Sequence, residues 1–181
     1  GRSLRELAAQ PLFLAAVIGA ALGYGVMNLL MAATPIAMGQ CGHPFERAAL
    51  VLEWHVLGMF VPSFFTGNLI QRFGALRIMS VGALLNLGCV AVALSGVDLM
   101  QFLVALTLLG VGWNFLYTGG SSLLTQTYAP EEKTRAQGAM DSAVFWTMAL
   151  TSFASGALIT TQGWTWLNLG SLLPIAMVLA A

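Results

Sequence analysis

Three ionisable side chains, Glu53, His55 and Asp141, stand in or next to long apolar stretches of this sequence. An ionisable group in a deeply apolar segment is costly to bury, and it is by default a candidate for binding a substrate or carrying a proton. Glu53 and His55 are about 200° apart around a helix, so only one of them can face a given cavity. His55 is better suited to proton transfer, because the unperturbed pKa of histidine is near 6.5.

The neighbours on each helical face indicate which of the two groups faces a cavity. His55 shares its face with small or polar residues that suit a cavity wall: Gly58, Met59, Pro62 and Thr66. Glu53 shares its face with apolar residues that suit lipid contact or packing: Leu57, Phe60 and Phe64. We therefore expect His55 to serve substrate or proton binding and Glu53 to matter less. The alternative is that both are structural partners.

Asp141 is the third proton-coupling candidate. It shares a face with mostly small and polar residues: Phe145, Met148, Ser152, Ser155 and Gly156. It also lies in the first turns of its predicted helix, where a carboxylate stabilises the positive end of the helix dipole. The sequence leaves both interpretations open.

A polar stripe follows the predicted helix at 99–128. At 100° per residue, six polar residues fall within one arc about 100° wide: Thr107, Asn114, Tyr117, Thr118, Ser121 and Thr125. Polar groups that face lipid are not tolerated, so the stripe either lines a cavity or forms interhelical hydrogen bonds, at about 0.6 kcal/mol each. The candidate substrate-binding residues are Asn28, His55, Trp113, Asn114, Tyr117, Thr118, Ser121, Phe145 and Ser152.

The helices that position these residues follow from the distribution of charge. Of 181 residues, 58% are apolar and only 8% are charged, against about a quarter charged in soluble domains. The charges leave uncharged runs at 7–45, 54–71, 78–97, 99–130 and 142–181. Since about 20 apolar residues cross the hydrocarbon core of a bilayer, we predict an all-α membrane protein. Its six helices lie at about 11–38, 47–70, 76–95, 99–128, 134–160 and 164–181.

Composition also narrows the function. A net charge of zero without a basic stretch argues against nucleic-acid binding, which needs cations to neutralise phosphates. Cys41 and Cys89 have no metal-ligand spacing, so neither a metal site nor a cofactor is expected. The two histidines have no second ligand at helical spacing, and a membrane enzyme is therefore disfavoured.

Basic residues determine the expected orientation. The N-terminal lead, the 71–77 turn and the 129–135 loop share one side and hold six of the seven Lys and Arg residues, while the other side holds only Arg47. Cytoplasmic loops carry the excess of Lys and Arg. Both ends of the segment are therefore expected in the cytoplasm.

An internal repeat relates the two halves of the chain. Residues 63–74 and 152–163 share six identities in twelve positions. Helices 47–70 and 134–160 would then be counterparts that run in opposite directions. We expect a single domain, 1–181, built from two inverted three-helix repeats at about 1–97 and 98–181, with a substrate near the midplane.

A motif lies in the turn after helix 47–70. Through Gly67, Arg72, Gly74 and Arg77 it resembles the cytoplasmic Gly-x-x-x-x-Arg-x-Gly-x-x-Arg loop signature of the major facilitator superfamily. Arg72 stands where the family usually has Asp. With six spans and a weakened signature, the chain resembles the C-terminal half of such a transporter, helices seven to twelve. Residues 54–67 and 112–120 resemble a bacterial permease subset.

This resemblance implies secondary transport of a small solute across the bacterial inner membrane by alternating access, with protons as the coupling partner. The expected partners are the solute, membrane lipid and an N-terminal six-helix half. The chain starts with Gly1 and stops at Ala181 within an apolar run, so we expect an excised segment. The alternative is a non-transporting membrane scaffold or sensor of the same fold.

Overall fold

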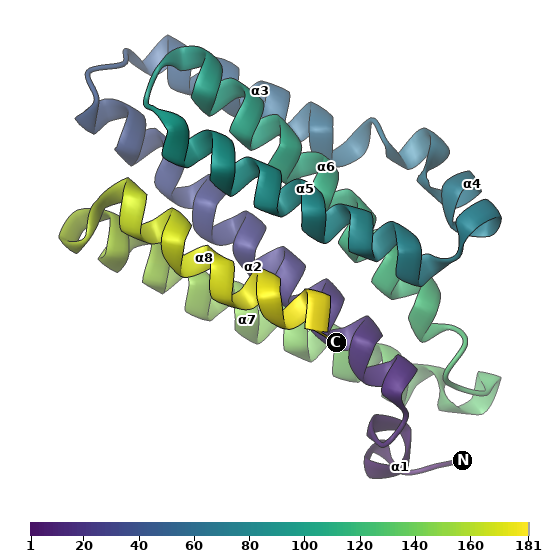
Figure 1. Ribbon diagram of the computed structural model, residues 1–181. Helices are drawn as coiled ribbons and strands as arrows, with labels where there is room; N and C mark the ends of the chain where they lie inside the picture. Colours follow the sequence, from purple (N-terminus) through teal and green to yellow (C-terminus); the bar gives the residue numbers. More distant parts are fainter. Residues whose placement is uncertain (181) are drawn as a thin grey trace.

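The computed structural model describes residues 1–180, which form helices and connecting turns without strands (Figure 1). Pro11 begins the second helix, where a first-turn proline is tolerated, and Gly74, with φ of 90°, forms the turn between the fourth and fifth. The helices are Leu4–Ala8 (α1), Pro11–Gln40 (α2), Phe45–Phe60 (α3), Ser63–Phe73 (α4), Ala75–Ser95 (α5), Leu99–Leu124 (α6), Lys133–Thr161 (α7) and Gly163–Ala180 (α8), with a 3₁₀ turn, η1, at Pro130–Glu132.

The all-α membrane fold is confirmed. Five of the described helices are long and apolar enough to cross a membrane, and the bent pair α3 and α4 makes up to six. The predicted continuous helix at 47–70 needs correction, because α3 and α4 meet at 42° around Val61 and Pro62. Proline has no N–H and its ring clashes with the preceding turn, which breaks the helix.

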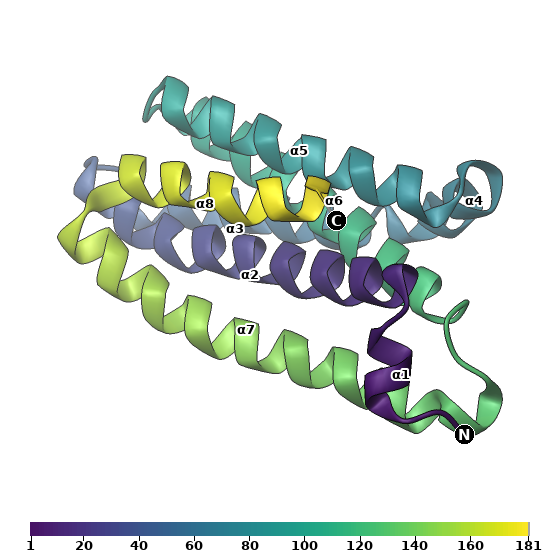
Figure 2. The same ribbon diagram turned by 60° about the horizontal axis from the view of Figure 1, so that its bottom comes forward.

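Helices α2 and α6 form the centre of the bundle. Helix α3 packs mainly on α6 and α7 mainly on α2, while α5 and α8 cover one side of the central pair. Figure 1 views the bundle from the α5 and α8 side, and Figure 2 shows α7 on the far side of α2 from α5. We call the opposite side, between α3 and α7, the open face; it includes Tyr24, Phe60 and Tyr117.

Glycines allow α3 and α6 to approach closely. A Cβ on Gly58 would lie 2.7 Å from the carbonyl oxygen of Thr107, and a Cβ on Gly110 would meet the carbonyl oxygen of His55. Membrane helices associate through such small residues, since lipid supplies no hydrophobic force between them. The backbone contact brings the polar groups of α3 within reach of α6.

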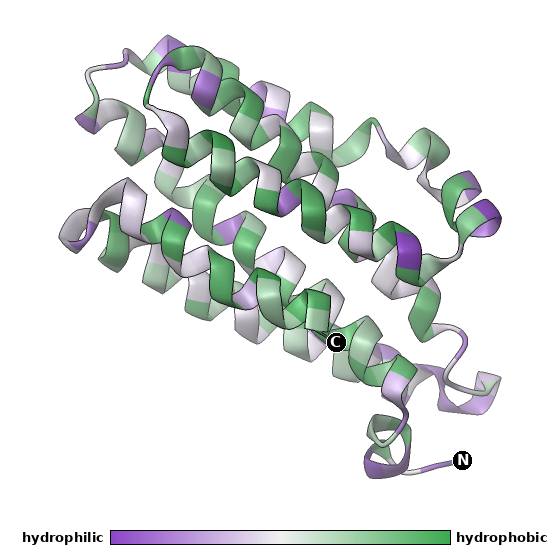
Figure 3. Cartoon of the chain, in the orientation of Figure 1, coloured by the Kyte–Doolittle hydropathy of each residue, from purple (hydrophilic) through white to green (hydrophobic). Residues whose placement is uncertain are grey.

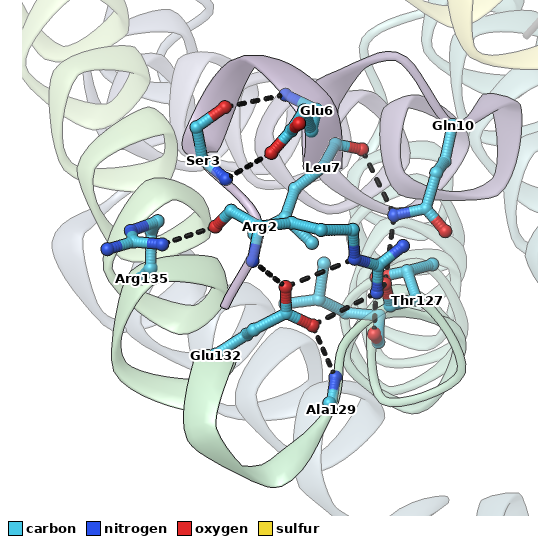
Figure 4. A network of polar contacts seen from close by, with 10 residues as sticks. Arg2, Ser3, Glu6, Leu7, Gln10, Thr127, Ala129, Glu132 and Arg135 are labelled. Atoms are coloured by element: carbon cyan, nitrogen blue, oxygen red, sulfur yellow. Dashed lines mark hydrogen bonds and ion pairs between the residues drawn. The ribbon is translucent and has the colours of Figure 1, made fainter.

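Polar residues gather at the ends of the bundle (Figure 3). At one end, Glu132 joins the N-terminal lead to the α6–α7 connection (Figure 4). Its carboxylate accepts from the Arg2 amide (2.6 Å), from Arg2 Nη2 (3.0 Å) and from the Ala129 amide (2.8 Å). The Thr127 carbonyl accepts from Arg2 Nη2 (3.0 Å) and Gln10 Nε2 (2.9 Å), and Arg135 donates to the Arg2 carbonyl.

These donors change the acidity of Glu132. Its side chain is buried, and the bonds from the Arg2 side chain and the Ala129 amide lower the pKa of Glu132 to about 2. Glu132 precedes α7 among other charged residues, so it lies outside the membrane span. Because the folded pKa lies below the unfolded value, the network contributes stability above about pH 4.5 and loses it as the pH falls toward 2.

We predict that Glu132→Gln releases the N-terminal lead. At neutral pH, amides of residues 2–9 should exchange with deuterium faster in the variant than in the wild type, because Gln cannot form the ion pair with Arg2. The difference should shrink as the pH falls from about 4.5 toward 2. Glu131→Gln, which changes an exposed neighbour, is the control; equal effects of both variants would contradict the assignment.

Candidate functional site

Four aromatic side chains from three helices form a cluster at mid-span. Trp113 and Tyr117 of α6 stack with ring centroids 5.4 Å apart and planes 10° apart. Tyr24 of α2 meets both edge-on, at 5.4 and 5.5 Å, and Phe60 of α3 meets Trp113 at 5.8 Å. The cluster therefore ties α2, α3 and α6 together beside the open face.

The aromatic cluster is only partly covered. Phe60 is 55% exposed, and Tyr24 and Tyr117 are half-buried. Trp113 is 93% buried, and its indole N–H has no hydrogen-bond acceptor among the described residues. The exposed parts of these rings suit a planar ligand, since aromatic rings favour stacked and edge-on contacts.

Asn28 lies one helical turn beyond Tyr24, at the seam between α2 and α7. Its Nδ2 lies 2.7 Å from Ser152 Oγ, 3.1 Å from Thr151 Oγ1 and 3.2 Å from the Met148 carbonyl oxygen. Ser155 Oγ donates to the Leu29 carbonyl at 2.7 Å. Asn28 and Ser152, two of the predicted cavity residues, are therefore brought together, and they fasten α7 to α2.

The structure leaves Glu53 exposed on its predicted apolar face, but it buries His55 on a surface that the sequence assigned to a cavity wall. His55 is fully buried between α3 and α6, where Nδ1 donates to the Leu106 carbonyl at 2.7 Å. That bond leaves Nε2 of the neutral ring without a partner among residues 1–180. The face that His55 shares with Gly58 and Thr66 is a helix-packing surface, because the small residues serve close approach to α6 and do not form a cavity wall.

Glu53 is exposed and borders a groove of about 600 Å³ between α2 and α3. The groove is lined by Pro35, Phe45, Ala48, Ala49, Leu52, Glu53, Val56 and Leu57. Pro35 is eleven residues beyond Tyr24, which returns it to nearly the same face of α2. The groove therefore opens on the same side of the bundle as the aromatic cluster. Glu53 contributes a carboxylate to its lining.

Asn114 is buried at the break between α3 and α4. Its Nδ2 donates to the Met59 carbonyl (2.8 Å) and to Ser63 Oγ (2.9 Å), and its Oδ1 accepts from Thr66 Oγ1 (2.6 Å). A proline break exposes backbone groups that neighbouring helices must satisfy within a membrane. All three contacts are interhelical, which favours packing over cavity lining for this part of the stripe.

The remaining predicted residues are spread over the molecule. Thr118 and Ser121 are partly exposed on α6, and Phe145 and Asp141 are exposed on α7. Of the loop motif, Gly67 lies within α4 and Gly74 directly follows it, while Arg72 and Arg77 extend from either side of the α4–α5 turn.

Two residues of the aromatic cluster, Tyr24 and Phe60, were not predicted from sequence. Tyr24 precedes Asn28 by one helical turn, a spacing that could have indicated a shared face. Phe60 shares the apolar face of Glu53 and offered no such signal, because only the packing of α3 on α6 brings it to Trp113.

Comparison of the sequence with known proteins identifies its family. The sequence profile of the Major Facilitator Superfamily matches residues 14–181. The riboflavin transporter RfnT of Brucella anthropi is 43% identical over 168 residues, which cover 93% of this chain and 42% of RfnT.

Two uncharacterised MFS-type transporters of Bacillus subtilis are also similar. YddS is 32% identical over 84% of this chain and 36% of its own length, and YdeG is 35% identical over 74% of this chain and 30% of its own length. The chain thus spans less than half the length of each of these three relatives.

We predict that Asn114→Ala destabilises the full-length protein. Up to three interhelical hydrogen bonds are lost, each worth about 0.6 kcal/mol, so the free energy of unfolding should fall by about 2 kcal/mol. Thr125→Ala is the matched control, because the exposed Thr125 hydroxyl bonds only to the Ser122 carbonyl of its own helix end. Equal unfolding midpoints for the two variants in detergent would exclude this role for Asn114.

Proposed function

The chain belongs to the major facilitator superfamily, a family of transporters and not of enzymes, and we propose that it is the C-terminal half of a secondary transporter that works by alternating access. The open face supports the proposal. It carries partly exposed aromatic residues mid-span, where a second six-helix half would complete a cavity. The length of RfnT, of which the chain matches 42%, leaves room for such a half.

The proposed substrate is riboflavin or a similar planar heterocycle. The aromatic cluster is the observation that carries this proposal, because a tricyclic ring can stack on the exposed parts of Phe60, Tyr24 and Tyr117. The 43% identity to a riboflavin transporter supports the same class of solute. Asn28 and Ser152, which fasten α7 to α2 one turn from Tyr24, are proposed to border the cavity.

Protons are the proposed coupling ion, and the chain is proposed to lie in the bacterial inner membrane with both ends cytoplasmic. Glu53 is the best-placed carrier, since its carboxylate borders a groove on the cavity side. His55 offers a buried Nε2 that would take up a proton only where α3 moves relative to α6. Asp141, exposed near the start of α7, remains a third candidate. The division into inverted repeats stays a prediction.

We predict that Trp113→Leu weakens riboflavin transport. In proteoliposomes of the full-length protein, the concentration for half-maximal uptake should rise about three- to tenfold, since an aromatic pair contributes about 0.5–1.5 kcal/mol. Trp113→Phe should restore most of the effect, because it keeps an aromatic ring beside Tyr24, Phe60 and Tyr117. Trp166→Leu is the control, because Trp166 is 63% exposed on α8. Absence of riboflavin flux in the wild type would refute the proposed substrate.

We predict that Glu53→Gln uncouples transport from protons. The variant should retain exchange of labelled for unlabelled solute, which needs no net proton movement, and should lose accumulation driven by a pH gradient. Glu46→Gln, at the exposed start of α3, should behave as wild type. Should His55→Gln show the uncoupled pattern while Glu53→Gln does not, the carrier is His55.

A further inference from the structure

A second groove lies on the side of α6 away from the open face, between α4, α5 and α6. It has a volume of about 340 Å³ and is lined by Leu69, Phe73, Arg77, Ile78, Val81 and Phe115. Phe115 is two residues from both Trp113 and Tyr117, about 200° around the helix. The groove therefore faces the surrounding bilayer and is separate from the proposed substrate site.

Two arginines border this groove. Arg77 lines it directly, and the Arg72 guanidinium carbon lies 5.2 Å from the centre of the Phe73 ring, which forms part of the wall. Both side chains are exposed, and within residues 1–180 neither guanidinium has an ion-pair partner. The sequence has no acidic residue between Glu53 and Asp98 that could pair with them locally.

The turn between α4 and α5 produces this arrangement. Gly74, with φ of 90°, reverses the chain after Phe73, so that Arg72 and Arg77 come from the end of one helix and the start of the next. The bend at Pro62 directs α4 away from α3 and leaves its Leu69 and Phe73 side beside α5. The two arginines, which have no ion-pair partner among residues 1–180, thus lie beside an apolar groove at the end of the bundle.

We propose that this groove binds an anionic phospholipid of the bilayer, with its phosphate on Arg72 and Arg77 and an acyl chain along the groove. A guanidinium forms strong, often bidentate hydrogen bonds to phosphate oxygens, and basic pockets between membrane helices bind anionic headgroups. The apolar wall selects a lipid over a soluble anion, because it offers no further polar partner. The proposal does not depend on the transported solute.

Native mass spectrometry of the full-length protein in detergent tests the site with phosphatidylglycerol and phosphatidylcholine of identical acyl chains. The wild type should bind phosphatidylglycerol about tenfold or more tightly than phosphatidylcholine, given a favourable contribution from each arginine. The double variant Arg72→Gln/Arg77→Gln should lose this preference, while Arg72→Lys/Arg77→Lys should keep most of it.

Two further variants distinguish the contribution of the arginine charges to lipid binding from that of the apolar groove. Arg47→Gln removes an exposed arginine outside this groove and should leave the preference unchanged. Val81→Trp fills the groove at a position 42% exposed, and should weaken binding of both lipids. Equal binding of the two lipids by the wild type, equal loss in Arg47→Gln, or full displacement of phosphatidylglycerol by glycerol 3-phosphate would overturn the proposal.

Discussion

The hydrogen bonds of Asn114 to the break between α3 and α4 are the interaction on which the rest of the arrangement depends. Within a bilayer no water is available to satisfy the backbone around Pro62, so a side chain from a neighbouring helix must do so. Asn114 meets Met59, Ser63 and Thr66 together, and it reaches them because Gly58 and Gly110 let the two backbones touch. The bend then turns α4 away from α3 and opens the groove on the bilayer side of α6.

The same contact determines which side chains remain for function. Once Gly58, His55 and Thr66 are committed to α6, the other side of α3 presents Glu53 and Phe60 toward the open face. Phe60 completes the aromatic cluster with Tyr24, Trp113 and Tyr117, all held on the two central helices. The rings of the cluster are thus packed against one another across the two central helices.

Charged groups occupy the ends of the bundle, where they remain near water. The Arg2 and Glu132 pair joins the N-terminal lead to the α6–α7 connection, and Arg72 and Arg77 stand at the α4–α5 turn without partners in the described chain. The paired and the unpaired charges have different consequences. A satisfied network holds two segments of the chain together, whereas free guanidinium groups beside an apolar groove favour an external anion.

The sequence by itself determined the class of the protein, the number of spans and the limits of most helices, because the length and spacing of uncharged runs are dictated by the thickness of the bilayer. It also singled out Asn114 and Tyr117, through the polar stripe, and Trp113, within the 112–120 stretch that resembles a permease subset. Only the tertiary structure decided what surrounds each side chain. Helical periodicity specifies which residues share a face, but not whether that face meets another helix, lipid or a cavity. For this reason His55, expected on a cavity wall, lies instead against α6. The contact of Phe60 with Trp113 likewise joins residues more than fifty positions apart, which a local pattern does not contain.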